Sequence, residues 1–530
     1  MAAPMPHERP SRTEQAIGWV LFGVALAPRL TVALLPIPTQ LIKTLTDDAF
    51  YYFLTAQHIL RGAGPSVDGI NPSNGWHPLW LLVNLIVQAF PWPNPDAPLH
   101  LALAFSAVFD ALVVVVLYHA ARCSISAGAA AVGALIYALN AMPALQSVNG
   151  LETGLAALLI AAAWASTLRL IRDPSTGKAL LWGLTFGLCF LARTDTALIL
   201  LWLGLYGLLN LPQAVRWRLV LLGAAVASAL IAPWLMWNWL AFGSPLAQTS
   251  AAAVPWAIRA RYAMAYPDEP LWRLSLQVLT HPAGWLRGDY LGAPPFVGFV
   301  LWPLALIGMA WFRPLFPPPN RRGGQRARPL PLAHIALLLL AGGITLLLVH
   351  AVLRRYPRPW YFVVMAQSLA LGLALLWERI QPSRQRGVML AALAIVLLMP
   401  GVLVWQIGYY PWQSIQLEAA QWIRQNTSPQ AVIASMNSGI MGYYGERTTI
   451  NLDGVVNPQA FAAIRAGRLL AYMQGAGVDY FIDSDHALEN EYAPFMGPDY
   501  RRGLREVTTI GAPYTGLGYW RVYEVLPPER

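Results

Sequence analysis

Charged residues are scarce in this sequence. Asp, Glu, Lys and Arg make up 12% of its 530 residues, whereas a soluble domain carries about 25%. Hydrophobic residues account for 56%, and the mean hydropathy is +0.46. Such a chain has too few polar groups to cover a globular surface. The composition therefore argues against an ordinary soluble protein and predicts an integral membrane protein.

Cysteine is almost absent. Cys123 and Cys189 lie far apart at or inside predicted membrane spans, so we expect neither a structural disulfide nor a Cys/His metal site. No internal repeat is visible, which gives no support to an inverted-repeat transporter. The net charge of +10 comes from basic residues scattered between apolar runs, as in the cytoplasmic loops of membrane proteins. We therefore expect no nucleic-acid partner.

Apolar runs of about the length that crosses a bilayer, roughly 20 helical residues, recur along the chain. We predict about eleven spans, at residues 16–36, 99–121, 126–145, 151–171, 179–192, 196–210, 219–240, 296–312, 332–352, 360–377 and 387–405. A single helix over residues 126–171 would be about 69 Å long, which is far more than the thickness of a bilayer. We therefore predict a break at residues 149–152 and, by the same argument, a second break at residues 193–195.

The side of the membrane on which each loop lies depends on whether residues 77–90 cross it. This apolar segment is only about 14 residues long, which is short for a span. If it does not cross, the basic loops fall on the side of the N-terminus, including residues 313–331 with five Arg and no acid. Short basic loops are cytoplasmic. We therefore predict a multi-pass protein of the plasma or inner membrane with residues 38–98, residues 243–295 and everything after residue 405 outside.

The composition becomes globular near residue 411. We divide the chain into a cytoplasmic tail (1–15), a membrane domain (16–410) and a soluble domain (411–530) of ordinary size. In the soluble domain the patterns predict helices at 413–424 and 458–475 and strands at 431–435, 448–452 and 478–482. The fold class is thus a polytopic α-helical membrane protein with a small extracytoplasmic α/β domain.

The first external loop carries candidate catalytic and substrate-binding residues. Asp47 and Asp48 are adjacent carboxylates at the membrane surface, and neighbouring like charges split their pKa values so that one can act as a base. The alternative is a solvated loop start. Tyr51, Asn74 and His77 follow as candidates for substrate binding, although a lone His is more often a satisfied interfacial residue.

The next two external hairpins carry Glu152 and the pair Arg193 and Asp195. Ionisable groups this close to bilayer depth are functional candidates by default. Arg193 and Asp195 could equally form a structural pair. Asp110, near the middle of a span, is predicted to be a packing or pairing residue.

A basic segment on the outer side contradicts the usual charge distribution of membrane proteins. Arg354, Arg355 and Arg358 precede the span at residues 360–377. Arginine binds phosphate bidentately, Tyr361 could flank a sugar or an isoprenoid, and Arg261 in the long loop could join the same site. The alternative is attraction to anionic lipid headgroups.

These features, in this order, resemble the GT-C superfamily of membrane glycosyltransferases, which includes protein O-mannosyltransferases and aminoarabinose and arabinofuranosyl transferases. Members open a long external loop with an acidic pair, place a second acidic residue in the next external loop, and have seven core spans before another long external loop. Asp47-Asp48, Glu152 and the loop at 243–295 match this order over roughly residues 16–405. The pair here is Asp-Asp where several members have Asp-Glu.

The resemblance implies inverting transfer of a sugar from a polyprenyl-phosphate donor to an extracytoplasmic acceptor, which is a lipid, a glycan or a protein. It implies Asp47 as the base. Asp48 and Glu152 would orient hydroxyls or hold a divalent cation such as Mg²⁺ or Mn²⁺. The residues implied for the donor phosphate are Arg358, Arg193, Arg355 and Arg261.

Two functions of other classes stay open. A transporter or flippase of a lipid-linked sugar would need ionisable residues along a transmembrane path, whereas here they gather at one face. A non-catalytic scaffold that displays the soluble domain would leave the acidic pair unexplained.

Overall fold

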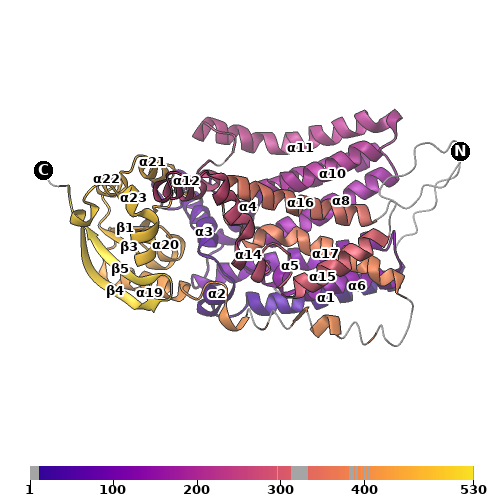
Figure 1. Ribbon diagram of the computed structural model, residues 1–530, viewed down its shortest axis with the longest axis horizontal. Coiled ribbons are helices and arrows are strands. Elements are labelled where there is room, and N and C mark those ends of the chain that lie inside the picture. The colour runs from indigo at the N-terminus through magenta and orange to yellow at the C-terminus, as the bar shows by residue number, and fades with distance from the viewer. Residues whose placement is uncertain are drawn as a thin grey trace, which may run out of the picture.

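The computed structural model describes residues 11–246, 248–294, 296–311, 332–380 and 405–528, with isolated residues between 387 and 402. A bundle of roughly parallel helices makes up most of the molecule, and the soluble domain lies at one end of it (Figure 1). The predicted loop at 313–331 and most of the predicted span at 387–405 lie outside the described residues.

Six helical segments are long and apolar enough to cross a membrane. They are α1 (Arg12–Ala33), α5 (Asp96–Ala121), α8 (Thr153–Arg172), α11 (Gln213–Phe242), α16 (Leu332–Leu353) and the pair η2 (Pro359–Phe362) and α17 (Val363–Arg379). Shorter apolar helices accompany them: α4 (Pro78–Gln88), α6 (Ala127–Leu139), α9 (Thr176–Ala192), α10 (Ala197–Asn210, continuing η1, Thr194–Thr196) and α15 (Val297–Trp311). The chain is thus mostly helical, as predicted, and it is a multi-pass membrane protein.

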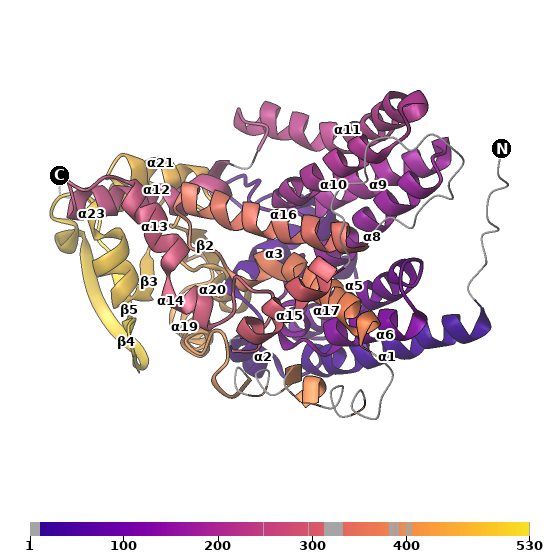
Figure 2. The same cartoon turned by 45° about the vertical axis from the view of Figure 1, so that its right-hand side comes forward.

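The membrane helices differ widely in burial, with α17 at the centre of the bundle and α11 at its edge. In the most apolar 18-residue stretch of Pro359–Arg379, 89% of the residues are buried, whereas in the corresponding stretch of α11 only 11% are. Figure 2 shows α11 at the edge of the bundle beside α9 and α10. A helix that is apolar on all sides yet unburied by protein is suited to lipid contact.

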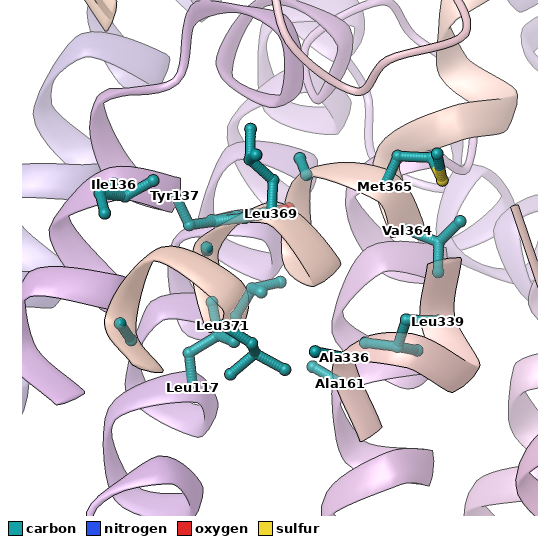
Figure 3. Close-up of a cluster of buried hydrophobic side chains, with 14 of the residues drawn as sticks. Leu117, Ile136, Tyr137, Ala161, Ala336, Leu339, Val364, Met365, Leu369 and Leu371 are labelled. Atoms are coloured by element: carbon teal, nitrogen blue, oxygen red, sulfur yellow. The ribbon is translucent and has the colours of Figure 1, made fainter. Parts of the chain in front are cut away.

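The core of the bundle lies where α5, α6, α8, α16 and α17 meet (Figure 3). Leu117 of α5 lies near Leu371 of α17, and Leu339 of α16 lies near Val364 of α17. The contacts are mostly between Leu, Val and Ala side chains, which allow close helix packing without unpaired polar atoms.

An ion pair joins three helices inside this bundle. Arg29 Nε donates to Asp110 Oδ2 at 2.6 Å, and the Tyr137 hydroxyl donates to Asp110 Oδ1 at 2.7 Å. Arg29 also reaches the carbonyls of Ala25 and Ala138. The pairing role predicted for Asp110 is confirmed, because the carboxylate ties α1, α5 and α6 together.

Both predicted helix breaks are present. α7 (Ala141–Gln146) ends before residues 149–152 and α8 begins after them, while α9 ends at Ala192 and η1 takes the chain through residues 194–196. The structure adds a break inside the segment predicted as one span at 126–145. Asn140 has extended backbone angles there, and its side chain caps α7 by accepting from Met142 N–H.

Short helices fill the space between the bundle and the soluble domain (Figure 1). They are α2 (Ile37–Lys43), α3 (Asp47–Leu60), α4, α12 (Gln248–Ala265), α13 (Trp272–Thr280) and α14 (Pro282–Leu286). α4 has only 11 residues, fewer than the roughly 20 that a perpendicular span needs. These helices come from the two long loops predicted from the sequence.

The soluble domain is built on a five-stranded mixed sheet with the order β2-β1-β3-β5-β4. β1 (Val432–Ser435) pairs in parallel with β2 (Thr448–Asn451) and β3 (Tyr480–Ser484). β5 (Gly518–Val525) pairs antiparallel with β3 and with β4 (Leu504–Tyr514). The three parallel strands are short and buried, as expected for strands covered on both faces.

Helices surround this sheet. They are α19 (Gln413–Asn426), α20 (Gly439–Gly445), α21 (Pro458–Arg465), α22 (Leu469–Gly475), η3 (His486–Tyr492), α23 (Ala493–Met496) and η4 (Tyr500–Gly503). The predicted strands overlap β1, β2 and β3, and the helix predicted at 458–475 is divided into α21 and α22. The β4–β5 hairpin was not predicted, because Gly511 and Pro513 weaken the strand signal of β4.

The soluble domain packs directly against the membrane-proximal helices. Ile440, Tyr443 and Val456 belong to the same buried apolar cluster as Phe50 and Phe53 of α3. Beside this cluster, the Tyr443 hydroxyl donates to the carbonyl of Pro95 at 2.7 Å, and the Tyr444 hydroxyl donates to Asp96 Oδ1 at 2.8 Å. The continuous core fixes the domain against α3.

Candidate active site

The site is built on the first turns of α3, whose N-terminal end carries the acidic pair. Residues four apart in a helix share a face, so Asp47 lies with Tyr51 and Asp48 lies with Tyr52. The backbone N–H of Thr46, just before α3, donates to the carbonyl of Asn149 at 3.2 Å. This bond joins the start of α3 to the hairpin that carries Glu152.

Asp47 faces the soluble domain. Its Oδ1 accepts from Ile440 N–H at 2.7 Å and its Oδ2 accepts from Gly439 N–H at 3.2 Å. A β-carbon at Gly439 would lie 2.3 Å from the Asp47 carbonyl oxygen, so the two backbones approach as closely as only glycine permits. Burial raises the pKa of Asp47 to about 7, and Asp48 adds to the shift, while the two N–H donors oppose it.

Gln413 of α19 completes this docking contact. Its Nε2 donates to the carbonyls of Leu41 and Leu45 at 2.6 and 2.7 Å, and its Oε1 accepts from Asp47 N–H at 2.6 Å. The side chain is 2% exposed. One amide therefore satisfies three backbone groups where the chain passes from α2 into α3, and it attaches the soluble domain to them.

Asp48 has a different environment, because its side chain is exposed. Desolvation by the surrounding protein raises the pKa of Asp48, and Arg358 and Arg355 oppose that shift. Glu152 acts in the same direction as desolvation. Asp48 is thus an accessible carboxylate that interacts electrostatically with two cations of residues 354–358.

Glu152 is the centre of a buried hydrogen-bond network. It is 4% exposed, and its Oε2 accepts from the Tyr52 hydroxyl at 2.9 Å. Its Oε1 lies 3.8 Å from His77 Nε2 and 3.7 Å from Arg193 Nε. The Tyr52 hydroxyl in turn accepts from His77 N–H at 3.1 Å. Desolvation lowers the pKa of His77, although Glu152 opposes that shift.

Arg193 is held from several sides. Its Nε lies 3.0 Å from Asp195 Oδ1, and one terminal N–H donates to the Trp360 carbonyl at 2.8 Å. Its guanidinium stacks on the Tyr361 ring at 4.3 Å from the centroid, and Arg355 lies over the same ring at 5.6 Å. The predicted pair of Arg193 and Asp195 is therefore real, and it is one part of a larger network that includes Glu152.

The three arginines of residues 354–358 have different environments. Arg354 Nε donates to the Leu271 carbonyl at 3.2 Å, at the start of α13. Arg355 stacks on Tyr361 as described above. Arg358 is exposed, and no carboxylate oxygen of the described residues comes within 4.0 Å of its guanidinium. Arg358 is thus available to a ligand, whereas Arg354 is tied to the long loop.

A small cavity lies beside Arg193 and Asp195. Its walls come from α8, α10, α16 and α17, with Ile160, Ile199 and Leu346 among its lining residues. Tyr361 and Trp360 line it next to the charged pair. The cavity has room for about one water molecule, so it is a gap in the helix packing beside the charged pair.

Three residues predicted for the site are placed differently. Arg261 lies 3.6 Å from Glu491 of the soluble domain, so an ion pair occupies the group expected to bind phosphate. Asn74 is 1% exposed and donates to Asn238 Oδ1 at 2.8 Å, so it is not available to a substrate. Tyr51 is 4% exposed, and its hydroxyl accepts from Asn451 at 3.2 Å, so it joins the two domains instead.

The structure adds Tyr52, Gln413 and Asp453 to the site. The four-residue spacing between Asp48 and Tyr52 was a usable signal for the first. No local pattern pointed to the other two, because both belong to the soluble domain and reach α3 only through the tertiary fold. Asp453 follows β2 and interacts electrostatically with Asp48 and Asp47.

The residues do not fit a resident metal ion. In the part of the chain that the structure describes, no group of three or more His, Cys, Asp or Glu side chains is arranged to hold one. Asp47 already accepts two backbone N–H groups, and Glu152 is engaged by Tyr52.

Comparisons with known proteins agree with this architecture. Residues 96–237 match the family model of dolichyl-phosphate-mannose-protein mannosyltransferases. Residues 402–523 match a domain of unknown function (DUF8728). No curated protein matches the sequence.

Solved structures match over nearly the whole chain. ArnT from Cupriavidus metallidurans bound to undecaprenyl phosphate has a TM-score of 0.57 at 14% identity, covering 97% of this chain and 100% of that one. The oligosaccharyltransferase AglB from Archaeoglobus fulgidus, in complex with an inhibitory peptide and a dolichol-phosphate, has a TM-score of 0.53 at 13% identity, covering 96% and 74%. The expected resemblance is confirmed: residues 96–237 match the mannosyltransferase family model, and the whole chain shares the fold of these GT-C membrane glycosyltransferases.

Proposed function

We propose that this protein transfers a sugar from a polyprenyl-phosphate-linked donor to a hydroxyl of an extracytoplasmic acceptor, with inversion at the anomeric carbon. The observation that carries the proposal is the placement of Asp48. It is an exposed carboxylate on the helix face of Tyr52 that interacts with Arg358, Arg355 and Glu152. A carboxylate that could act as a base and two cations that could bind a leaving phosphate are therefore close enough to interact electrostatically.

The base in this proposal is Asp48, not the Asp47 expected from the sequence. A general base must reach the proton it removes. Asp47 is 6% exposed, and both of its oxygens accept backbone N–H groups of α20. Asp48 has no hydrogen bond to another side chain among the described residues and is open to solvent. Asp47 then serves to position the soluble domain.

The reaction is a single displacement. Asp48 takes the proton of the acceptor hydroxyl, and the oxygen attacks the anomeric carbon from the side opposite the phosphate. The bond from the anomeric carbon to the phosphate oxygen breaks, and its electron pair leaves with the polyprenyl phosphate. Arg358 and Arg355 stabilise the charge that develops on that phosphate. Glu152 is 4% exposed and accepts from the Tyr52 hydroxyl, so it acts by holding Tyr52 on the helix face of Asp48.

The donor phosphate is assigned to the segment of Arg355 and Arg358. Arg358 is exposed, and Arg355 lies over the Tyr361 ring at 5.6 Å from its centroid. The similar solved structures of ArnT and AglB carry undecaprenyl phosphate and a dolichol-phosphate, which supports a donor of that class. The acceptor class, whether lipid, glycan or protein, stays open.

The proposed topology places the reaction outside the cytoplasm. About eleven spans, with α4 not crossing, put the N-terminus and the Arg-rich segment at 313–331 in the cytoplasm of the plasma or inner membrane. The acidic pair, Glu152, the segment of Arg355 and Arg358, and the soluble domain then share the outer side. Their clustering in the structure supports this arrangement.

The test compares two matched substitutions in the purified full-length protein. Asp48→Asn keeps size and polarity but cannot accept a proton, so sugar transfer should fall by roughly 10²–10⁴. Asp268→Asn is the control, because Asp268 is an exposed residue of the other long loop. Transfer is measured as release of polyprenyl phosphate from polyprenyl-phosphate mannose and polyprenyl-phosphate arabinose. Near-parental transfer by Asp48→Asn, with any donor that the parent accepts, would remove Asp48 from the role of base.

A further inference from the structure

The long loop at residues 243–295 contains a short helix with two different apolar sides. α13 packs against α16 (Figure 2), and its side chains Leu274 and Val278 are buried. Trp272 and Leu276 are four residues apart and therefore share another face of the helix, where they are 60% and 48% exposed. The protein thus covers one apolar side of α13 and leaves the other uncovered.

The third side of α13 is polar. Arg273, Gln277 and Thr280 are exposed and lie together, because residues three and four apart in a helix are neighbours. Arg273 Nη1 donates to Glu269 Oε1 at 2.9 Å, just before the helix. A surface helix surrounded by water has polar residues on its exposed side, so the uncovered apolar face of α13 indicates a further environment beside protein and water.

That environment is indicated by the membrane helix next to α13. α16 is long and apolar enough to cross a membrane, and near its end Leu348 and Val352 are 50% and 68% exposed. α13 begins beside that end, because Arg354 Nε, one residue after α16, donates to the Leu271 carbonyl at 3.2 Å. α13 therefore lies where α16 leaves the membrane. An apolar face, a polar face and a Trp at the boundary are typical of helices that lie in the plane of a membrane surface.

Both ends of α13 are attached to the chain that follows α16. At the C-terminal end the link is Tyr290, whose hydroxyl donates to the Val278 carbonyl at 2.9 Å and whose ring lies edge-to-face with that of Phe362, at 5.7 Å between centroids. The ring of His281, directly after α13, lies edge-to-face with that of Tyr356 at 4.8 Å. Together with the bond to the Leu271 carbonyl at the other end, these contacts hold the chain on both sides of the basic residues.

The turn that starts this chain needs such support. Arg354 has a φ of 59°, a left-handed conformation that residues other than glycine adopt at a cost in free energy. The N–H groups of Arg354 and Arg355 donate to the carbonyls of Ala351 and His350 at 3.0 and 2.9 Å, which closes the end of α16. A strained turn persists only where its surroundings hold it, and α13 supplies the bond to the Arg354 side chain.

We propose that α13 lies in the surface of the outer leaflet, with Trp272 and Leu276 against the acyl chains and Arg273 and Gln277 among the headgroups. The partner of this helix is the lipid bilayer itself. In this position α13 holds residues 354–358 at the level of the lipid phosphates. The choice of the outer leaflet and the meeting of these arginines with a donor phosphate rest on the topology and the transferase function proposed above. The contact of α13 with lipid is independent of both.

The first experiment locates α13 in nanodiscs of phosphatidylcholine. The full-length protein without Cys123 and Cys189 receives Leu276→Cys, or the matched control Gln277→Cys on the polar side, and is labelled with the fluorophore NBD. Phosphatidylcholine with a spin label on its acyl chain should quench the label at position 276, at a depth of about 5–10 Å, whereas aqueous iodide should quench the label at position 277. A label at position 276 that iodide reaches and the lipid does not, or that a protein partner shields from both, would overturn the proposal.

The second experiment tests the attachment of α13 to residues 354–358. Leu276→Asp places a charge on the lipid side and should lift α13 from the membrane, whereas Gln277→Asp places the same charge on the polar side. Amide exchange in residues 354–358, read by mass spectrometry, should accelerate by about fivefold in Leu276→Asp, because the hydrogen bond from Arg354 to Leu271 is lost. Gln277→Asp should keep the parental rate.

Parental exchange in Leu276→Asp, or equal acceleration in both variants, would overturn the attachment. Neither experiment requires sugar transfer. A protein that gives both expected results but releases no polyprenyl phosphate would therefore overturn the proposed transferase function and leave the membrane contact of α13 standing.

Discussion

Asp47 and Asp48 are neighbours in the chain but interact with different parts of the protein. Asp47 accepts two backbone N–H groups of the soluble domain, at 2.7 and 3.2 Å. Asp48 is exposed and interacts with Arg358 and Arg355 of the membrane domain. The rotation of about 100° between successive helical residues separates them. The acidic pair therefore combines a docking residue with a candidate base.

The first prediction concerns docking. In Asp47→Asn one side-chain oxygen becomes an NH₂ group, which cannot accept from a backbone N–H, so either Gly439 or Ile440 loses its partner. A net hydrogen bond is worth about 1 kcal/mol, so amide exchange in residues 439–445 should accelerate by about fivefold. Hydrogen exchange read by mass spectrometry measures this. Asp48→Asn is the matched control and should leave exchange in that segment at the parental rate.

One outcome of this experiment would reassign the base. Parental exchange in Asp47→Asn, combined with a loss of transfer as large as that of Asp48→Asn, would return the base to Asp47. The soluble domain would then be held by its apolar contacts and by Gln413 alone.

The breaks between membrane helices could be predicted from the sequence. A bilayer limits helix length, so the long apolar runs had to be interrupted, and the polar residues at 149–152 and 193–195 were the available positions. Placing those hairpins on one side brought Glu152, Arg193 and His77 into one predicted site. The structure does bring these three together.

The contribution of the soluble domain could not be predicted in the same way. Asp453 and Gln413 are separated from α3 by more than 350 residues of chain, and nothing in their local sequence indicates the contact. Arg261 was predicted to bind the donor phosphate, but the structure pairs it with Glu491. Nothing in the sequence around Arg261 indicates this partner. The orientation of Asp47 could have been inferred by treating residues 47–60 as a helix, since the spacing to Tyr51 and Tyr52 defines its two faces.

The second prediction is a pH dependence. A carboxylate base acts only when ionised, so transfer should decline as the pH falls through the pKa of Asp48. Desolvation raises that pKa above its usual value of 3.8, and Arg358 and Arg355 oppose the shift. The acid limb of the kcat profile should therefore lie above pH 3.8 and move to still higher pH in Arg358→Ala. A limb at or below 3.8, or a shift to lower pH in Arg358→Ala, would contradict the assignment of Asp48.

The third prediction separates a phosphate site from general attraction to lipid. Hydrogen bonds to charged groups are worth about 1.5–3 kcal/mol, so Arg358→Ala should weaken donor binding by roughly tenfold to a hundredfold. Arg358→Lys should restore only part of this, because Lys lacks the bidentate geometry. Arg354→Ala should bind the donor almost as the parent does, since Arg354 is bonded to the Leu271 carbonyl.

Donor affinity is measured for this third prediction in nanodiscs of neutral lipid, which removes the attraction to anionic headgroups. Equal and small effects at Arg354, Arg355 and Arg358, with Lys as good as Arg, would mean that the basic segment is only a membrane anchor.

The fourth prediction tests the topology on which the shared external site depends. In a background without Cys123 and Cys189, Gln325→Cys reports on the Arg-rich segment at 313–331 and Asn490→Cys on the soluble domain, where Asn490 is exposed. An impermeant thiol reagent applied to intact cells, or to spheroplasts where an outer membrane blocks access, should label Asn490→Cys and leave Gln325→Cys unlabelled until the cells are opened. Short basic loops are retained in the cytoplasm, and α4, with 11 residues, is too short to reverse the order of the loops. Labelling of Gln325→Cys from outside would instead make α4 a crossing helix. The acidic pair would then lie on the opposite side of the membrane from the segment of Arg355 and Arg358, and the proposed site could not form.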